Sequence, residues 1–342
     1  MKDAIEIKPL GRDTTQEQLV VYKAAFQSAK KWEDKYQAWT KKHYENPLGD
    51  SLVFGAYHDG KLVGMNSYMP VEYQYKGKTI PMLQSCESGV LPEYQGKGIW
   101  SKVVRFAVDY IFQNTKYQAV IGFPNYINSY PGFKKMGWDT LFGMNNYVMV
   151  NNAKEFAKGL FKSKKVLQLL GRCIFIQKTG IWLYGRGYQG FKIEECGFDN
   201  LFWDDDRDVL SVTHSYELLK WKESYKGIKT LSIKSDNNPI ASCIYSFGEY
   251  EGSQIIKIEK CVLPEGSSIS LKKAVALLAK YFAQKYPHIA FIRVWAMPET
   301  EFASALKGLL FLKSSHPNPF IIKQNTEAFS DKKWNLSFFD LD

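Results

Sequence analysis

The sequence has few cysteines and no long apolar run, and each absence narrows the class of protein. Five cysteines occur in 342 residues, and no two of them form a C-x-x-C pair. An odd number of scattered thiols in a chain of this size favours reduced cysteines over a disulfide scaffold. Residues 1–6 lack the apolar stretch of a signal peptide. We therefore expect a cytoplasmic protein.

The sequence also lacks the compositional bias of a disordered or fibrous chain. Hydrophobic residues make up 45% of it, aromatic residues 15% and charged residues 23%, which is typical of globular proteins. A single core rarely grows beyond about 250–300 residues, so the length predicts two domains. The 45 Lys and Arg exceed the 35 Asp and Glu, which gives a net charge of +10. This excess favours an anionic partner, whether a phosphate-rich small molecule, nucleic acid or anionic lipid.

The second half of the chain repeats the first. Val90-Leu91-Pro92-Glu93 recurs as Val262-Leu263-Pro264-Glu265, at an offset of 172 (262 minus 90). Both copies lie between a predicted strand and a predicted amphipathic helix, and such self-similarity indicates a duplicated unit. We divide the chain into residues 1–150, 151–210 and 211–342, which are two α+β units joined by a basic, partly helical connector.

One segment carries a strong binding signal. Tyr94 to Ser101 reads Y-Q-G-K-G-I-W-S, between a predicted strand and a predicted helix. Gly96 and Gly98 let the backbone turn sharply, and the N–H groups at the start of the helix form an anion site. Lys97 adds a positive charge, so the pattern predicts a pyrophosphate-binding turn. It lacks the third glycine of a dinucleotide fingerprint and the G-K-[ST] of a P-loop.

Read from Val90 to Gly98, this turn follows the pattern V-x-P-x-x-Q-x-x-G and resembles the coenzyme A turn of the GNAT acyltransferase superfamily. Gly122 to Asn125 and Phe133 to Trp138 look like the next motif of that superfamily, an Asn after a strand and then aromatic-x-K-x-G-aromatic. Lys61 to Gly64 looks like one of its front strands. The resemblance covers roughly residues 5–150.

The chain as a whole resembles bacterial proteins encoded with surface-polysaccharide genes. Those proteins often pair two GNAT-like units and end in W-x-x-x-x-x-D-x-D, here Trp334 to Asp342. The resemblance implies an α+β fold of two GNAT-like units with mixed, mostly antiparallel sheets flanked by helices. Residues 1–150 would be the catalytic unit that binds acetyl-coenzyme A. In residues 211–342, Glu265 to Ser268 replace the glycine turn, so we expect this unit to be degenerate and not to bind coenzyme A.

The resemblance also implies a chemistry, in which an acetyl group passes directly from acetyl-coenzyme A to an amine. We predict an amino sugar or sugar nucleotide of surface-polysaccharide synthesis as the acceptor. The thioester carbonyl would accept a hydrogen bond from backbone N–H near Gly89 and Val90. The cofactor-binding residues that the resemblance implies are Gly89, Val90, Leu91, Gln95, Gly96, Lys97, Gly98, Ile99, Trp100, Ser101, Asn125 and Phe133. No metal is expected, because the histidines are scattered away from other ligand types.

Two positions depart from the family pattern. Trp100 stands where the superfamily usually has Gly or Ala, so we expect a bulkier pyrophosphate pocket. Phe133 aligns with the tyrosine that often protonates the departing thiolate, and it has no acidic proton. We predict Tyr130, one helical turn earlier, as the replacement acid and Glu87 as the general base. The alternatives are an aromatic ring that packs on the turn and an acid that faces solvent or pairs with a lysine.

The connector and the tail each have two interpretations. Over 151–176 the connector interleaves Phe156 and other apolar residues with lysines. It is either a helix that lies on an anionic membrane or a solvated helix that packs on a domain. Asp340 and Asp342 reach the acceptor only if the tail folds back, and are otherwise solvated. No recognised nucleic-acid-binding module is present, so we expect no nucleic acid partner.

Two other functions remain open. A Fem-type aminoacyl transferase also pairs two GNAT-like units, uses charged tRNA and would suit the net charge of +10. Such proteins usually carry a long helical arm, and the glycine turn favours coenzyme A instead. The third possibility is a non-catalytic binding protein that keeps a GNAT fold but has lost its activity. The intact glycines of the turn argue against this possibility.

Overall fold

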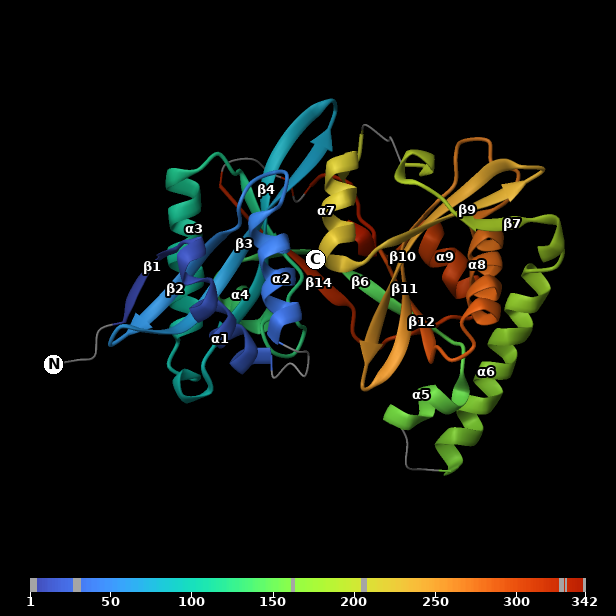
Figure 1. Cartoon of the computed structure of the whole chain (residues 1–342), viewed down its shortest axis with the longest axis horizontal. Coiled ribbons are helices and arrows are strands. Elements are labelled where there is room, and N and C mark those ends of the chain that lie inside the picture. Colours follow the sequence, from blue (N-terminus) through green and yellow to red (C-terminus); the bar gives the residue numbers. More distant parts are fainter. Residues whose placement is uncertain are drawn as a thin grey trace.

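The structure is a computed structural model that describes residues 5–26, 32–160, 164–203, 208–325, 329 and 331–340. Two units lie side by side, the first coloured blue to green and the second yellow to red (Figure 1). The first contains β1 (Glu6–Leu10), α1 (Thr15–Phe26), α2 (Trp32–Tyr44), β2 (Leu52–His58), β3 (Lys61–Tyr75), β4 (Lys78–Val90), α3 (Ile99–Asn114), β5 (Ala119–Gly122), α4 (Tyr130–Lys135) and β6 (Asp139–Val150).

The rest of the chain forms the connector helices, the second unit and three strands that join the sheet of the first unit. Its elements are α5 (Ala153–Leu160), α6 (Lys164–Tyr184), β7 (Lys192–Glu195), β8 (Leu210–Val212), α7 (Tyr216–Lys226), β9 (Lys229–Ser235), β10 (Asn238–Tyr250), β11 (Ser253–Val262), α8 (Leu271–Lys285), β12 (Phe291–Ala296), α9 (Glu301–Gly308), β13 (Leu312–Lys313), β14 (Asn318–Gln324) and β15 (Trp334–Asn335).

Both units contribute to one continuous sheet, in the order β1-β2-β3-β4-β5-β14-β6-β12-β11-β10-β9-β7. Along this order the β4–β5 and β11–β12 pairs are parallel and the other pairs are antiparallel. Helices flank the sheet on both units (Figure 1). The predicted α+β fold with a mixed, mostly antiparallel sheet is therefore confirmed.

The two units exchange strands where they meet. β14, from the end of the chain, lies between β5 and β6 and pairs antiparallel with both. β6 is shared: Asp139–Met144 pairs with β14, and Asn145–Val150 pairs with β12. Each half of the sheet thus contains a strand from the other side of the predicted boundary. The division at residue 150 remains a prediction about sequence ranges, but the folded units are interlocked.

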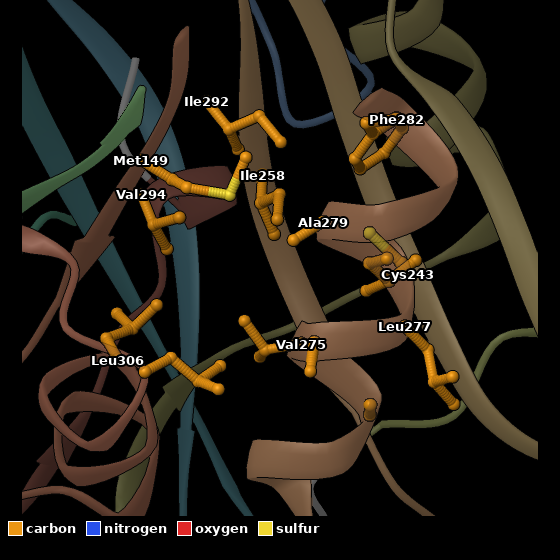
Figure 2. Close-up of a cluster of buried hydrophobic side chains, with 14 of the residues drawn as sticks. Met149, Cys243, Ile258, Val275, Leu277, Ala279, Phe282, Ile292, Val294 and Leu306 are labelled. Carbon is orange, nitrogen blue, oxygen red and sulfur yellow. The ribbon is translucent and has the colours of Figure 1, made fainter. Parts of the chain in front are cut away.

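The exchange also joins the cores. Met149, on β6, packs with Ile258, Ile292 and Val294 of the second unit, and α8 covers this layer through residues such as Val275 (Figure 2). In the first unit, α3 buries an apolar face on the sheet in the same way, through Val103, Val104, Ala107, Val108 and Ile111. Full burial of a Val or Ile side chain contributes about 1.5–3 kcal/mol, so each helix is held firmly on its strands.

Candidate active site

The sheet of the first unit splits between β4 and β5. These strands pair in parallel only as far as Ser85 opposite Gly122, while β4 continues to Val90. A cavity of about 630 Å³ opens between the diverging ends, a size that suits a small-molecule ligand. It is lined by Tyr22, Ala25, Gln84, Ser85, Cys86, Glu87, Ser88, Gly89, Val90, Gln95, Gly122, Phe123, Pro124, Asn125, Asn128, Ser129 and Phe133.

Val90 turns its backbone polar groups toward this cavity. The Leu91 N–H donates to the Val63 carbonyl of β3 at 2.9 Å. Hydrogen-bonding direction alternates along an antiparallel strand, so the Val90 N–H points to the opposite edge of β4, where β5 has diverged. The Gln95 side chain donates to the Val90 carbonyl on that edge at 3.1 Å. Val90 therefore presents the N–H that the resemblance places near a thioester oxygen.

Gly89 is required by the helix that crosses it. A Cβ at this position would lie 2.8 Å from the Cβ of Ala25 on α1 and 3.5 Å from a methyl group of Val21. Only a residue without a side chain lets α1 approach the strand so closely. This approach closes one side of the cavity beside Val90.

The glycine turn has the geometry that its sequence predicts. Gly96 and Gly98 have φ angles of 76° and 71°, in the left-handed region that glycine tolerates best. Gly98 is the N-cap of α3 and supplies no side-chain cap, and the Lys102 N–H donates to the Gly98 carbonyl at 3.2 Å. The N–H groups of Ile99 to Ser101 precede that bond and point out of the helix end. Such N–H groups can bind an anion, and the turn that leads to them begins at Gln95, which lines the cavity.

Lys97 and Leu91 serve this turn in different ways. Lys97 is exposed, with its Nζ 4.9 Å from the centre of the Tyr94 ring, so its charge is available to an anion on the turn. Leu91 is buried, as is Ile99 at the start of α3. These two apolar side chains anchor the turn to the core from both of its ends.

Trp100 is not among the described residues that line the cavity. Its indole packs on α4, where a Cβ added at Gly132 would lie only 2.3 Å from the ring. The ring also meets Phe133 edge to face, with centroids 4.9 Å apart. Gly132 thus makes room for the indole beside the turn, and the described cavity wall passes through Phe133 instead. The indole is thus directed toward α4, and the expectation of a bulkier pyrophosphate pocket stays a prediction.

Asn125 organises the loop opposite the turn. Its Oδ1 accepts the N–H groups of Ile127 and Asn128, each at 3.0 Å. Tyr130 follows, but its hydroxyl lies 3.0 Å from Oγ1 of Thr140, and its ring stacks on Tyr126. The described lining of the cavity does not include Tyr130. The structure thus favours the packed-ring alternative and lends no support to Tyr130 as the acid, which stays a prediction.

Glu87 lines the cavity, but its carboxylate is already engaged. Lys42 contacts Oε1, Ser67 donates its hydroxyl to Oε2 at 3.1 Å, and Nε2 of His43 lies 3.2 Å from Oε2. Burial alone would raise the pKa of Glu87, but Lys42 and His43 together hold it well below the usual range. A carboxylate of low pKa stays ionised and accepts a proton weakly. The structure favours the lysine-paired alternative over a general base.

Sequence reasoning missed the partners of Glu87. These partners are Lys42 and His43, which lie in the last turn of α2. The His43 side chain is fully buried, and its Nδ1 lies 2.9 Å from the hydroxyl of Ser51. The one local signal was a Lys-Lys-His run at a helix end, which says nothing of a carboxylate 45 residues away (87 minus 42).

The second unit splits in the same place, but its own chain enters the gap. β11 and β12 pair only as far as Ile258 opposite Val294. Beyond that point, Ser337 of the tail forms an antiparallel bridge with Ala296, and the Leu336 N–H lies 3.0 Å from the sulfur of Met297. A cavity of about 370 Å³ remains beside the tail.

The N-terminus of α8 is closed as well. Ser270 caps it by accepting the Lys273 N–H at 3.2 Å, whereas Gly98 of α3 offers no such cap. Ser267, which stands in place of the glycine turn, donates to the Ile240 carbonyl at 2.8 Å. These contacts agree with a second unit that has no open anion site.

The tail folds back, but not to the large cavity. Asp340 is buried, and its Oδ2 accepts the N–H and hydroxyl of Ser337 at 2.7 Å each. Its Oδ1 lies 3.3 Å from Nε2 of His214, beside a separate small cavity between the units. Asp340 therefore has an internal partner rather than a place near the acceptor. Asp342 lies outside the described residues.

Two further features bear on ligands. Among the helices that the structure describes, none combines the length and apolar character that a membrane-spanning segment needs. Over the same residues, no group of three or more His, Cys, Asp or Glu side chains is placed to bind a metal ion.

Residues 6–141 match the family model described as the acetyltransferase (GNAT) domain. The match begins at β1, includes the cavity and the glycine turn, and ends within β6. It confirms the predicted resemblance of the first unit to GNAT acetyltransferase domains. A search of curated protein sequences finds no match. The narrower resemblance to polysaccharide-cluster proteins stays a prediction.

Solved structures share the fold over nearly the whole chain. A GCN5-related N-acetyltransferase from Anabaena variabilis has a TM-score of 0.61 at 11% identity, over 94% of this chain and 73% of that one. A probable N-acyltransferase from Enterococcus faecalis V583 has 0.60 at 12%, over 94% and 73%. A putative acetyltransferase from Pyrococcus horikoshii has 0.58 at 12%, over 100% and 95%. At such identities the likeness concerns the fold alone.

Proposed function

We propose that this chain transfers an acetyl group from acetyl-coenzyme A to an amine acceptor in the cavity between β4 and β5. The observation that carries the proposal is that the cavity is lined by Val90 and Gln95 and therefore lies beside three features. These are the uncapped N-terminus of α3, the glycine turn before it, and the backbone edge of β4 at Val90. The pyrophosphate would bind at Gly96 to Ser101, and the pantetheine arm would follow β4 to Val90.

The chemistry needs no covalent intermediate on the protein. The amine nitrogen attacks the thioester carbon, a C–N bond forms, and the C–S bond breaks as coenzyme A leaves. The Val90 N–H would stabilise the negative charge that develops on the carbonyl oxygen during this step. The nitrogen gives up one proton, and the departing thiolate takes one. The relatives named as N-acetyltransferase and probable N-acyltransferase support nitrogen as the acceptor atom.

The assignment of the base follows from the contacts of Glu87. Its ionised carboxylate is shared between Lys42, His43 and Ser67, and it makes a poor acceptor for an aminium proton. We propose that Glu87 fixes the wall of the cavity and that water in the cavity carries the proton away. Tyr130 would hold the loop that follows Asn125 in place through its contact with Thr140.

The acceptor we propose is an amino sugar or a sugar nucleotide used in surface-polysaccharide synthesis. Apart from Glu87, the described polar side chains that line the cavity are neutral amides and hydroxyls, together with the Cys86 thiol. Such groups donate and accept hydrogen bonds and suit a ligand with many hydroxyl groups. The apolar wall formed by Tyr22 and Phe133 would be left for the pantetheine arm.

The test begins with binding. Acetyl-coenzyme A should raise the melting temperature of the wild-type chain, because a ligand that binds only the folded state stabilises it. Gly98→Asp should abolish that rise by placing a negative charge in the anion site. The matched control is Gly77→Asp, which has the same left-handed φ, with nothing within 4 Å, at the tip of the β3–β4 hairpin. It should keep the rise.

Turnover is then measured as free thiol released with a panel of amino sugars, and with the corresponding hydroxyl sugars as controls. Release with at least one amino sugar, and loss of release in Gly98→Asp, are the expected results. An unchanged melting response in Gly98→Asp would show that the turn is not the site. Competition of tRNA with coenzyme A would favour an aminoacyl transferase instead, and binding without any turnover would favour a non-catalytic protein.

A further inference from the structure

Helix α6 lies at the outer edge of the second unit (Figure 1), where the buried side chain of Gln177 holds it. The Gln177 Oε1 accepts the Val150 N–H at 2.9 Å, and its Nε2 donates to the carbonyls of Val148 and Leu310 at 3.1 and 3.0 Å. Ile174 and Ile181 lie on the same face of the helix and are buried with it. The orientation of α6 is therefore fixed, and its opposite face points to solvent.

That opposite face exposes four large apolar side chains. Phe175 is 73% exposed, Ile176 55%, Trp182 56% and Leu183 45%. The two pairs are seven positions apart, so the four residues form a stripe along the helix, here called the α6 stripe. Leu310, which is 47% exposed, extends it on the neighbouring loop. Single exposed apolar residues are common, but a continuous stripe marks an interaction surface.

The charged residues of α6 and of the helix beneath it have one sign in the sequence. Residues 164–190, which include α6, contain five Lys or Arg and no Asp or Glu. Residues 266–298, which include the α8 helix beneath it, likewise contain five basic residues and no acid. The guanidinium of Arg186 lies 4.6 Å from the centre of the Trp182 ring. An aromatic ring flanked by a cation suits the headgroup region of a bilayer.

We propose that the α6 stripe binds the surface of a membrane that contains anionic lipids, with α6 lying in the interface. The apolar side chains would enter the boundary between headgroups and acyl chains, while the basic residues meet lipid phosphates. A second copy of the chain is the poorer partner, because a symmetric contact would bring two α6 helices without acidic residues, and their basic residues, together. The proposal is independent of the acetyl transfer in the first unit.

The membrane surface thus differs from the one that the sequence indicated. Phe156 of α5 is partly buried and meets Phe291 edge to face, with ring centroids 5.5 Å apart, so it faces the protein. The part of 151–176 that belongs to the α6 stripe is Phe175 and Ile176, and the stripe continues beyond that range.

Co-sedimentation with lipid vesicles tests the proposal on the full chain. We expect binding to vesicles of phosphatidylcholine with phosphatidylglycerol, weakened by added salt, and no binding to phosphatidylcholine alone. The double variant Phe175→Ser with Trp182→Ser should lose most of it. Its control is Val20→Ser with Tyr216→Ser, whose side chains are 52% and 50% exposed on other helices. That control should bind like the wild type.

A charge reversal gives an independent measurement. Lys178→Glu, on the exposed side of α6, should weaken vesicle partition by at least about fivefold, since each basic residue at an anionic surface contributes about 1 kcal/mol. Lys78→Glu, at the exposed start of β4, should leave partition unchanged. The melting temperature and its rise with acetyl-coenzyme A check that each variant is folded.

The proposal is overturned if the wild-type chain does not bind anionic vesicles. It is equally overturned if binding persists in both the double variant and Lys178→Glu. Sedimentation velocity covers the remaining outcome: if the double variant converts a dimer into a monomer while no chain binds vesicles, the α6 stripe is an interface between copies and not a membrane surface.

Discussion

Glu259 stands in β11 where Glu87 stands in β4, at the same offset of 172 that relates the two Val-Leu-Pro-Glu segments. Each carboxylate meets a lysine from the last turn of the preceding helix. Lys42 of α2 contacts Glu87, and Nζ of Lys226 on α7 lies 3.1 Å from Oε2 of Glu259. In the described part of the second unit, Ser270 caps the helix end that would bind an anion, so a pair that recurs there points to a role in the fold. We infer that each pair holds a helix on the strand that carries the glutamate.

Glu87→Gln and Glu259→Gln should therefore destabilise the chain to similar extents, by roughly 3–5 kcal/mol, because each removes one charge of a largely buried ion pair. Urea denaturation measures the loss. The folded-state pKa of Glu87 is depressed, so its contribution is complete above the ordinary glutamate value of about 4.3 and is lost as the pH falls below it. Glu87→Gln should lack that part of the acid sensitivity.

The pH profile of turnover distinguishes a structural role of Glu87 from a catalytic one. A general base produces an acidic limb in kcat/KM, and its removal abolishes that limb. We expect the limb to persist in Glu87→Gln and in Glu259→Gln alike, measured in the folded fraction. Selective loss of the limb in Glu87→Gln, with Glu259→Gln as its matched control, would restore Glu87 as the base.

The stoichiometry of coenzyme A should be one per chain. In the second unit the tail bridges Ala296 through Ser337, and Ser270 caps the helix where an anion would bind. Isothermal titration with acetyl-coenzyme A measures the number of sites directly. Gly98→Asp should reduce it from one to none. A value of two, or a residual site in Gly98→Asp, would show that the second cleft accepts the cofactor despite its tail.

Local features of the site could be predicted from the sequence because their causes lie within a few residues. Gly96 and Gly98 adopt left-handed φ angles and precede a helix, as the turn predicts. Asn125 turns the following loop through contacts two and three residues ahead. Such features depend on the residue type and its immediate neighbours, which a single sequence displays.

The remaining features depend on partners that are distant in the chain. The Trp100 indole can lie against α4 because Gly132 has no side chain. The Glu87 carboxylate is engaged because it contacts Lys42. β14 enters the first half of the sheet by pairing with β5, a strand nearly two hundred residues earlier in the chain. Periodicity predicts that a segment is a strand, but the choice between competing edges depends on packing that no short pattern contains.

Gly132→Ala should destabilise the first unit by about 1–3 kcal/mol, the usual effect of overpacking. The added methyl group would lie 2.3 Å from the Trp100 ring, so the indole or α4 has to move. Thermal unfolding measures the loss, and weaker binding of acetyl-coenzyme A should accompany it, because Trp100 belongs to the first turn of α3. The control is Gly190→Ala, which has open space around its Cβ position. Equal stability of the two variants would contradict the placement of the indole.

Acid should destabilise the joint between the units through His214. Burial, together with the charge of Lys260, lowers the pKa of His214 to about 3, against an ordinary value of about 6.5 in the unfolded chain. Between these values the unfolded chain binds a proton that the folded chain does not. Stability therefore falls as the pH falls from about 6.5, by up to about 1.4 kcal/mol per pH unit.

His214→Gln should flatten this slope, whereas His288→Gln, at an exposed position, should leave it as in the wild type. Urea midpoints measured between about pH 6.5 and 5 isolate the histidine, since most carboxylates titrate below that range. Asp340 contacts both His214 and Ser337 of the tail. His214→Gln should therefore also weaken the packing of the tail, which gives a second check. A slope that His214→Gln leaves unchanged would mean that the imidazole is already protonated beside Asp340.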